Sequence, residues 1–170
     1  MELNHQGYLI HYLRGQSGSD EESQISDLHI TVLGDIDDAA GIGLSALKPL
    51  VLSTPRGAID LIPQAVEPFG FDGQHRALTF GDPMGRLREL HEYFLTGVQA
   101  QGFRISRPQW AGANFRPHLT LVDGEPSSPE IFLQSMGGSL ELDSVTLVDS
   151  IFDGDWNFLR GEPLATVRLG

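Results

Sequence analysis

The sequence contains no cysteine, which excludes disulfide bonds, thiolate nucleophiles and zinc sites built on cysteine ligands. Basic residues are few: 11 lysines and arginines stand against 23 aspartates and glutamates, which gives a formal net charge of −12. Such an acidic protein repels the phosphate backbone of a long nucleic acid. Any phosphate-containing ligand is therefore expected to be small or to be bound by a local site.

Long hydrophobic runs are also absent. No apolar run approaches the roughly 18 residues of a membrane span, and no basic segment followed by an apolar one opens the chain. We therefore expect a cytoplasmic protein that does not bind membranes. With 170 residues, of which 40% are hydrophobic and 20% charged, the composition is typical of a globular protein. We expect one domain over residues 1–170, and a monomer.

The apolar pattern predicts both strands and helices. Strands are expected at 7–13, 28–33, 58–62, 76–80, 115–122, 140–152 and 164–169. Helices are expected at 36–52, 83–101 and 127–136, the second having the most regular helical spacing. Short strands in runs with a few helices indicate an α+β fold with mainly antiparallel sheets. Because the order of strand, helix and further strands occurs once in each half, we expect a pseudo-duplicated, bilobal fold of two sheets with helices on the outer faces.

Two copies of a His-x-Thr motif lie inside apolar strands. They read Leu28-His29-Ile30-Thr31-Val32-Leu33 and Phe115-Arg116-Pro117-His118-Leu119-Thr120-Leu121-Val122. With 6 histidines and seven threonines in the chain, chance predicts roughly 0.25 such motifs. Residues i and i+2 share one face of a strand, so the histidine and threonine of each copy point together while their apolar neighbours point into the core.

These residue types suit the cleavage of a phosphodiester. His29 and His118, with an ordinary imidazole pKa near ~6.5, can divide the roles of general base and general acid. The hydroxyls of Thr31 and Thr120 can donate hydrogen bonds to the nonbridging phosphate oxygens, where charge accumulates. No metal or other cofactor is expected, because the sequence has no His-Glu-x-x-His motif and no dense carboxylate set.

The two motifs resemble the signature motifs of the 2H phosphoesterases, the group that includes LigT-like and 2′,5′-RNA ligase-like proteins. The resemblance rests on His29-Ile30-Thr31 and Arg116-Pro117-His118-Leu119-Thr120-Leu121, and extends to the chain length, the motif separation and the helix before the second motif. It implies a bilobal duplicated fold with the motifs facing each other across a cleft. It also implies a metal-independent phosphodiesterase acting on 2′,3′-cyclic phosphates or 2′-5′ linkages.

The sequence departs from that family at two points. Val122-Asp123 stands where many relatives of the RNA ligase type have a basic residue, which argues against the same contacts with an RNA end. The first motif is shorter than the usual form, since Gly34 follows directly after Val32-Leu33. Arg116 can supply the missing positive charge to a substrate, or it can be a solvated strand end.

Five further residues are weaker candidates. Trp156 can stack on a base or anchor a turn to the core, and Trp110, in the loop before the second motif, allows the same two interpretations. Tyr12 lies on a strand that can neighbour the first motif. His91, on the apolar face of the predicted helix, is expected to be a core residue, and His75 a solvated loop residue.

The sequence therefore predicts a phosphodiesterase that hydrolyses a small 2′,3′-cyclic phosphate or a 2′-5′-linked nucleotide or oligonucleotide by two-histidine acid-base catalysis. The expected substrate is a small nucleotide or a short RNA end. Degradation of cyclic di- or trinucleotide signals, a role of some phage-encoded 2H-like proteins, is an alternative. A nucleotide-binding module without turnover is another.

Overall fold

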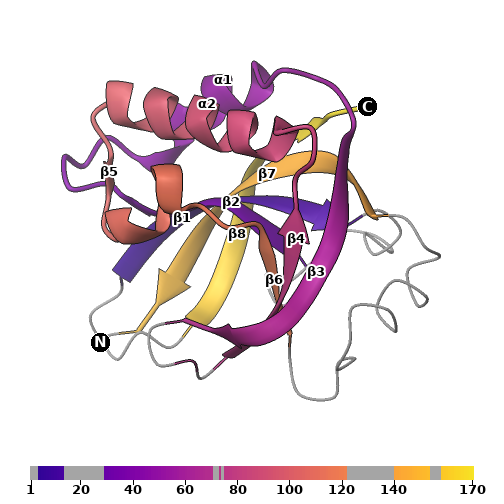
Figure 1. Cartoon of the computed structure of the whole chain (residues 1–170). Helices are drawn as coiled ribbons and strands as arrows, with labels where there is room; N and C mark the ends of the chain where they lie inside the picture. The colour runs from indigo at the N-terminus through magenta and orange to yellow at the C-terminus, as the bar shows by residue number, and fades with distance from the viewer. Residues whose placement is uncertain (1–3, 14–28, 71–72, 74, 122–139, 154–157) are drawn as a thin grey trace.

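All described strands of the computed structural model belong to one antiparallel sheet (Figure 1). The structure describes residues 4–13, 29–70, 73, 75–121, 140–153 and 158–170. The eight strands are β1 (Asn4–Leu13), β2 (His29–Asp37), β3 (Ile59–Phe69), β4 (His75–Gly81), β5 (Arg104–Ile105), β6 (His118–Leu121), β7 (Leu140–Phe152) and β8 (Phe158–Arg168). The α+β class is as predicted, and the strand predicted at 140–152 is found with those bounds as β7.

The strand order differs from the two separate sheets that were expected. Seven strands follow the order β1-β2-β6-β4-β3-β7-β8, β5 pairs with β2, and β1 also pairs with β7 along its full length. The pairing of Ile30 with Leu119 joins β2 to β6. Since these two strands carry the two motifs, the halves of the chain continue into each other as one curved sheet. The described strands therefore form one sheet, not two.

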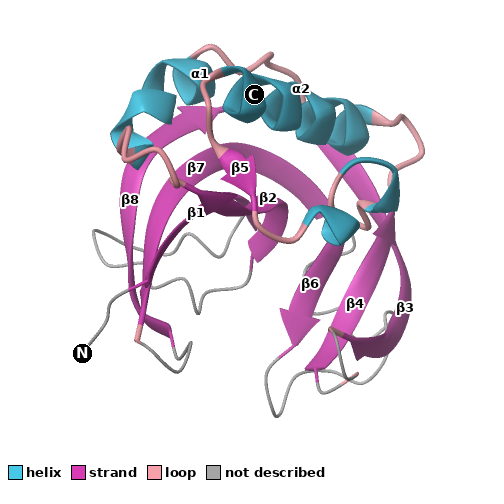
Figure 2. Ribbon diagram, turned by 90° about the vertical axis from the view of Figure 1, so that its left-hand side faces the viewer, coloured by secondary structure: helices cyan, strands magenta, loops and turns pink. Residues whose placement is uncertain are grey.

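Two α-helices cover one side of the sheet (Figure 2). These are α1 (Lys48–Leu52) and α2 (Arg86–Ala100), and α2 confirms the helix predicted at 83–101. The buried residues of α2 recur at intervals of three and four, as in an amphipathic helix that packs on a sheet; they are Leu87, Leu90, His91, Phe94 and Val98. No helix among the described residues is long and apolar enough to cross a membrane.

The helix predicted at 36–52 is wrong over its first half. β2 continues to Asp37, and Gly41 (φ 67°) and Gly43 (φ 91°) then adopt left-handed conformations that interrupt a helix. The carboxylate of Asp38 accepts hydrogen bonds from the backbone N–H groups of Ile42 (2.8 Å) and Gly43 (2.6 Å). Only the second half is helical, as a 3-10 turn at Leu44–Leu47 followed by α1.

β3 is longer than the strand predicted at 58–62. It runs through Pro63 and Pro68, with an irregular register between Pro63 and Ala65, and curves strongly across the front of the view in Figure 1. Prolines remove backbone donors and favour such irregular strands. The curvature carries the end of β3 towards β6. The helix predicted at 127–136 lies outside the described residues.

The hydrophobic core holds the apolar residues that alternate with the two motifs. Ile30, Val32 and Leu119 are fully buried, in one cluster with Phe94 and Val98 of α2. Burial of these alternating residues fixes which face of β2 and β6 points to the core, because alternate residues of a strand point to opposite faces. The histidines and threonines therefore share the face that the core leaves open.

Candidate active site

The four motif residues lie together on neighbouring strands. Because β2 and β6 are antiparallel and Ile30 is paired with Leu119, His29 lies opposite Thr120 and Thr31 lies opposite His118. Directly opposed residues have Cβ atoms about 4.5–5.5 Å apart, and the diagonal pair formed by the two histidines is separated by about 7–8 Å. The register thus places the two histidines diagonally across the strand pair, with a threonine opposite each.

His118 is held by its backbone neighbour and by an aromatic ring. Its Nδ1–H donates to the carbonyl oxygen of Arg116 (2.9 Å), and its ring stacks on Phe69 with a centroid separation of 3.9 Å and an interplanar angle of 25°. A hydrogen bond to a carbonyl fixes the tautomer with the proton on Nδ1. In the neutral ring Nε2 then carries the lone pair, and none of the described hydrogen bonds uses it.

The surroundings of His118 favour its neutral form. Burial lowers the pKa of His118 below the ordinary value of 6.5, and the positive charges of His29 and Arg116 act in the same direction. The hydrogen bond to the carbonyl of Arg116 acts in the opposite direction. The contribution of His29 agrees with the strand register, since charges influence each other this way only at short range.

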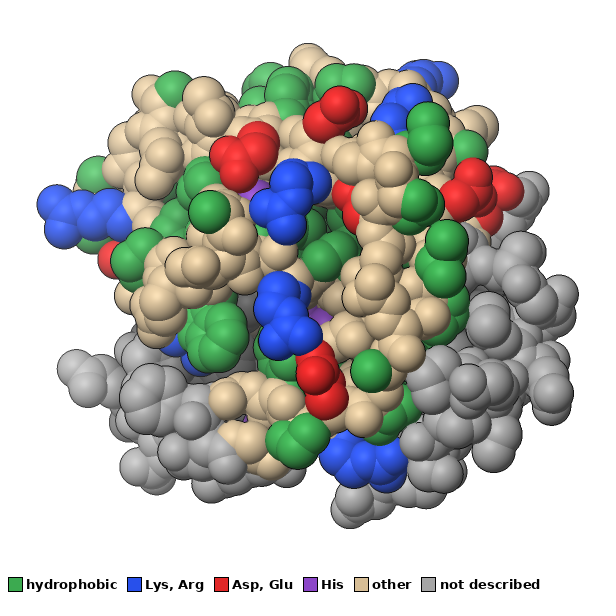
Figure 3. All heavy atoms as spheres, viewed as in Figure 1, with side chains coloured by type: hydrophobic (Ala, Val, Ile, Leu, Met, Phe, Trp, Pro, Cys, Tyr) green, Lys and Arg blue, Asp and Glu red, His purple; other side chains and the backbone are tan. Residues whose placement is uncertain are grey.

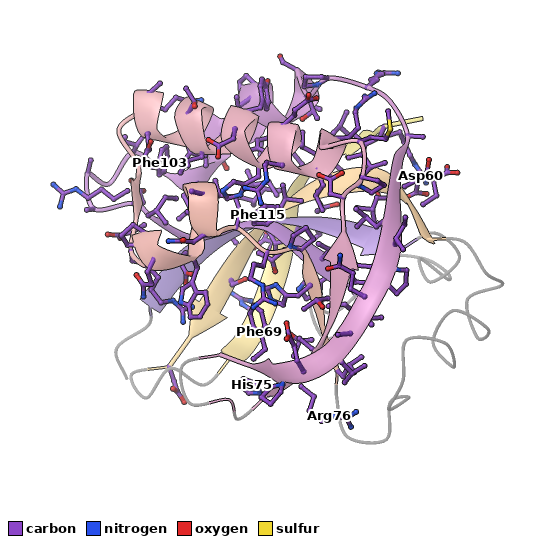
Figure 4. All side chains as sticks on the ribbon, in the orientation of Figure 1. Asp60, Phe69, His75, Arg76, Phe103 and Phe115 are labelled. Carbon is purple, nitrogen blue, oxygen red and sulfur yellow. The ribbon has the colours of Figure 1, made fainter. Side chains whose placement is uncertain are left out.

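A cavity of about 330 Å³ opens beside this set. It is lined by residues 31–35, 69–70, 75, 91, 105, 107, 110–111, 114–116, 118 and 120. Thr31, His118 and Thr120 are therefore part of its wall. On the molecular face in Figure 3, only small parts of histidine side chains are visible, recessed behind basic and hydrophobic ones. In Figure 4, Phe69 lies below Phe115, and His75 marks the lower end of β4.

Arg116 lies at the edge of the cavity and has an acidic partner. Its guanidinium forms an ion pair with Glu67 and lies over the ring of Phe69, 5.9 Å from the centroid. The side chain is 56% exposed. Arg116 is thus a solvated side chain whose positive charge lies close enough to His118 to lower the pKa of that imidazole; its contact with a substrate stays a prediction.

The remaining predicted residues differ in their positions. The strand register pairs Tyr12 of β1 with His29, whereas Trp156 lies outside the described residues. Trp110 lines the cavity. His75 is exposed, as expected, but it begins β4 and also lines the cavity.

His91 is a core residue, as predicted, and it also holds the wall of the cavity. Its Nδ1–H donates to the carbonyl of Val32 (2.6 Å), its Nε2 accepts from the N–H of Gly112 (2.8 Å), and its ring stacks on Phe115 at 4.1 Å. Burial lowers the pKa of His91 below 6.5, and the hydrogen bond to Val32 opposes this change. The residue joins α2, β2 and the segment that precedes β6.

Two features of the site were missed in the sequence. Phe69 follows a proline-interrupted stretch that gave no sign of contact with His118. Asp35 is buried and has a positive φ of 57°. Among the described residues, no other residue except glycine has a positive φ. Its carboxylate pairs with Arg107 (2.5 Å), 72 residues later in the chain, and its carbonyl accepts from the N–H of Ser106 (2.9 Å). Such long-range pairs have no local sequence signal.

The described residues contain no group of three or more histidines, aspartates or glutamates placed to hold a metal ion. The strand register gives a paired set of histidines and threonines on adjacent strands of an antiparallel sheet, beside a cavity with aromatic residues in its wall.

Solved structures with this fold include E. coli LigT. Its complex with 3′-AMP superposes with a TM-score of 0.58 at 16% sequence identity, covering 96% of this chain and 97% of that one. The apo form of E. coli LigT gives a TM-score of 0.56, also at 16% identity, with 96% of each chain covered. No protein-family model matches the sequence, and no curated protein matches it significantly. The chain has the LigT fold, in agreement with the fold that the resemblance implied.

Proposed function

We propose that the protein is a metal-independent phosphodiesterase that hydrolyses a small 2′,3′-cyclic phosphate or a 2′-5′-linked nucleotide or oligonucleotide. The observation that carries the proposal is the pairing of Ile30 with Leu119. This register brings His29, Thr31, His118 and Thr120 onto adjacent positions of two neighbouring strands, which supports a site at which they act together on one phosphate. The LigT fold supports the same reaction class, and 3′-AMP in one of the similar structures supports a nucleotide as ligand.

We assign the role of general base to His118. Its Nδ1 proton is used by the Arg116 carbonyl, and burial favours the neutral ring, so Nε2 is available to accept a proton from the attacking water. As the new P–O bond forms, the bond to the leaving oxygen breaks, and His29 donates a proton to that oxygen. Proton transfer by a positioned side chain contributes about 10²- to 10⁴-fold to the rate.

Thr31 and Thr120 are the phosphate ligands of this mechanism. Each lies opposite one histidine, so their hydroxyls can donate to the two nonbridging oxygens while the imidazoles act on the attacking and leaving oxygens. Removing one such donor typically lowers kcat by about 10²- to 10³-fold. Single substitutions of either threonine by valine, which keeps the shape of the side chain, should lower kcat by about this factor.

The test is hydrolysis in the presence of EDTA. The purified protein is incubated with nucleoside 2′,3′-cyclic phosphates, 2′-5′-linked dinucleotides and cyclic di- and trinucleotides, and the products are identified. His29→Ala and His118→Ala should abolish hydrolysis while leaving the circular dichroism spectrum unchanged. His75→Ala is the matched control, since this histidine lies at the rim of the cavity and has no proposed part in proton transfer; we expect less than a tenfold loss.

Two results would overturn the proposal. Near-normal hydrolysis by His118→Ala on every substrate that the wild type cleaves would show that the mechanism is wrong. Saturable binding of these compounds without any product would show a nucleotide-binding module instead. Cleavage of cyclic di- or trinucleotides alone would keep the mechanism and change the substrate.

A further inference from the structure

The cavity wall differs in charge from the protein as a whole. The chain carries a formal net charge of −12, whereas the Asp, Glu, Lys and Arg side chains described in the wall are two arginines, Arg107 and Arg116, and one aspartate, Asp35. The acidic partner of Arg116, Glu67, does not line the cavity. A cleft with an excess of one charge focuses the electric field, so this cavity favours a small anion even though the protein is acidic.

The two arginines lie in different parts of the wall. Arg116 is close to His118, which lies opposite Thr31 in the strand register. Asp35 follows Thr31 by four residues of β2, or about 13 Å of strand, and its carboxylate contacts the guanidinium of Arg107 at 2.5 Å. Thr31 and Asp35 both line the cavity. A ligand with one anionic group beside His118 can therefore reach Arg107 only with a second group, separated from the first by a unit such as a nucleoside.

Asp35 holds Arg107 in a fixed position. The side chain of Asp35 is 10% exposed and that of Arg107 is 57% exposed, so the acidic partner is buried and the basic partner faces solvent. Asp35 also has a left-handed backbone (φ 57°), a conformation that costs free energy and is concentrated at functional sites. The guanidinium is thus oriented before a ligand arrives, which lowers the entropic cost of binding.

The ion pair is not needed merely to fasten the segment that begins at Ser106. The carbonyl of Asp35 already accepts hydrogen bonds from the N–H (2.9 Å) and the hydroxyl (3.2 Å) of Ser106. Further along, the N–H of Gly112 donates to His91 (2.8 Å). An arginine has five N–H donors in a planar fork that matches two oxygens of a phosphate, and the contact with Asp35 engages one terminal nitrogen of Arg107. The chemistry of the exposed guanidinium is therefore that of a phosphate ligand.

From this arrangement we infer that Arg107 forms a second phosphate subsite, which binds a phosphate group separated by one nucleoside from the phosphate that is cleaved. The inference rests on the proposed function for the position of the cleaved phosphate, beside His118, Thr31 and Thr120 in the cavity wall. The second phosphate is a terminal 5′-phosphate or the next phosphodiester of a short oligonucleotide, and both present oxygens to the guanidinium. Arg107 then determines substrate specificity and takes no part in proton transfer.

The test compares three substrates that differ only in the second phosphate. Adenosine 2′,3′-cyclic phosphate has none, its 5′-phosphate carries a monoester, and its 5′-(methyl phosphate) carries a diester. The wild type should cleave at least one of the two phosphorylated compounds with a kcat/KM about tenfold higher than that for the first compound, a typical factor for one hydrogen bond to a charged group. Most of the gain should be in KM, and it should shrink at high salt. The better of the two compounds identifies the source of the second phosphate.

Arg107→Gln should remove this preference. The kcat/KM for the preferred compound should fall about tenfold, and that for adenosine 2′,3′-cyclic phosphate should change less than twofold. Arg107→Lys, which keeps the charge without the planar fork, should retain part of the preference. Arg104→Gln is the matched control, since Arg104 is an exposed arginine of β5 that does not line the cavity; it should leave all three values unchanged.

A purely structural role for Arg107 predicts a different result. Arg107→Gln would then lower kcat/KM by the same factor on all three substrates, which would overturn the subsite. Equal kcat/KM values of the wild type on all three would also overturn it, while leaving the proposed hydrolysis intact.

If the wild type hydrolyses none of the three compounds, binding decides. By calorimetry, adenosine 3′,5′-bisphosphate should bind about tenfold more tightly than adenosine 3′-monophosphate, and Arg107→Gln should remove the difference. This result without hydrolysis of any substrate would keep the subsite and overturn the proposed hydrolysis. Equal affinities for the two compounds, or no binding of either, would overturn the subsite.

Discussion

His91 and His118 both line the cavity and have closely similar surroundings. Each donates its Nδ1 proton to a backbone carbonyl, that of Val32 or Arg116, and each ring stacks on a phenylalanine, Phe115 or Phe69. Burial lowers the pKa of both imidazoles. Judged by tautomer, stacking and desolvation alone, the two histidines could not be told apart.

The difference lies at Nε2. In His91 this atom accepts the N–H of Gly112, so both ring nitrogens are used within the fold. In His118 no described hydrogen bond uses Nε2, and the ring lines the cavity beside Thr31 and Thr120. A lowered pKa is therefore not by itself a sign of catalysis, because structural histidines share it. A ring nitrogen that no described hydrogen bond uses, in a residue that lines the cavity, is the more specific feature.

The largest expected effect is the loss of hydrolysis in His118→Gln. Glutamine keeps a polar group of similar size but cannot accept a proton at neutral pH, so kcat should fall about 10³-fold. The free energy of unfolding, measured by urea denaturation, should change by about 1 kcal/mol or less, since the residue lies at the cavity rather than in the core. A large loss of stability with retained hydrolysis would make His118 the structural member of the pair.

His91→Leu should show the reverse pattern. The carbonyl of Val32 and the N–H of Gly112 would lose their partner, and each unsatisfied buried group costs about 1–3 kcal/mol. We expect the free energy of unfolding to fall by about 2–4 kcal/mol, while kcat at a temperature where the variant is folded falls less than tenfold. A loss of hydrolysis as deep as that of His118→Gln, in a stable protein, would contradict a purely structural role.

The local parts of this comparison could be predicted from the sequence. Alternation along β2 and β6 was enough to place each histidine with its threonine, and the helical spacing of Leu87, Leu90 and His91 was enough to bury His91. Both patterns depend only on residues within one element. Residues 36–52 show the limit of such patterns. Their apolar residues have helical spacing throughout, but the left-handed conformations of Gly41 and Gly43 prevent a helix over the first half.

The non-local parts could not be predicted. The pairing of Ile30 with Leu119 merges the expected two sheets into one, and it depends on contacts between residues far apart in the chain. The stacking of Phe69 on His118 depends on the curvature of a strand that passes through two prolines. Neither has a signal in the neighbouring sequence. The substrate, which depends on the cavity walls, is for that reason less determined by the sequence than the reaction class is.

The pH dependence of stability should reflect both histidines. Above pH 6.5, the ordinary imidazole pKa, His91 and His118 are neutral in both the folded and the unfolded state. Their contribution to the free energy of unfolding is then fully present. Below this pH the unfolded chain takes up protons that the folded protein, with lowered pKa values, does not. Stability should therefore fall with acidification, by up to about 1.4 kcal/mol per pH unit for each histidine. Urea titrations of the wild type and His91→Leu, from pH 7.5 to 5, should show a shallower slope in the variant.

Phe69→Leu should act on His118 and leave His91 unchanged. A smaller side chain admits water to the ring, and because burial is the largest cause of the lowered pKa of His118, that pKa should rise towards 6.5. The acidic limb of the pH–rate profile should then move to higher pH by a few tenths of a unit. Phe115→Leu is the matched control: it alters the ring stacked on His91 and should destabilise the fold without moving the profile. A shift of the pH–rate profile of equal size in both variants would contradict the assignment of catalysis to His118 and of a structural role to His91.

The smallest effect is expected from Glu67→Gln, which frees Arg116 from its ion pair. An exposed pair contributes about 0–1 kcal/mol, so stability should hardly change. Removal of the negative charge beside the cavity should lower KM for an anionic substrate about twofold at low salt. Asp143→Asn is the control, since it breaks the exposed pair with Arg168 (3.0 Å) on other strands and should leave KM unchanged. Because the carbonyl of Arg116, not its guanidinium, holds His118, kcat should stay within about threefold of the wild type; a much deeper fall would mean that the ion pair itself positions the general base.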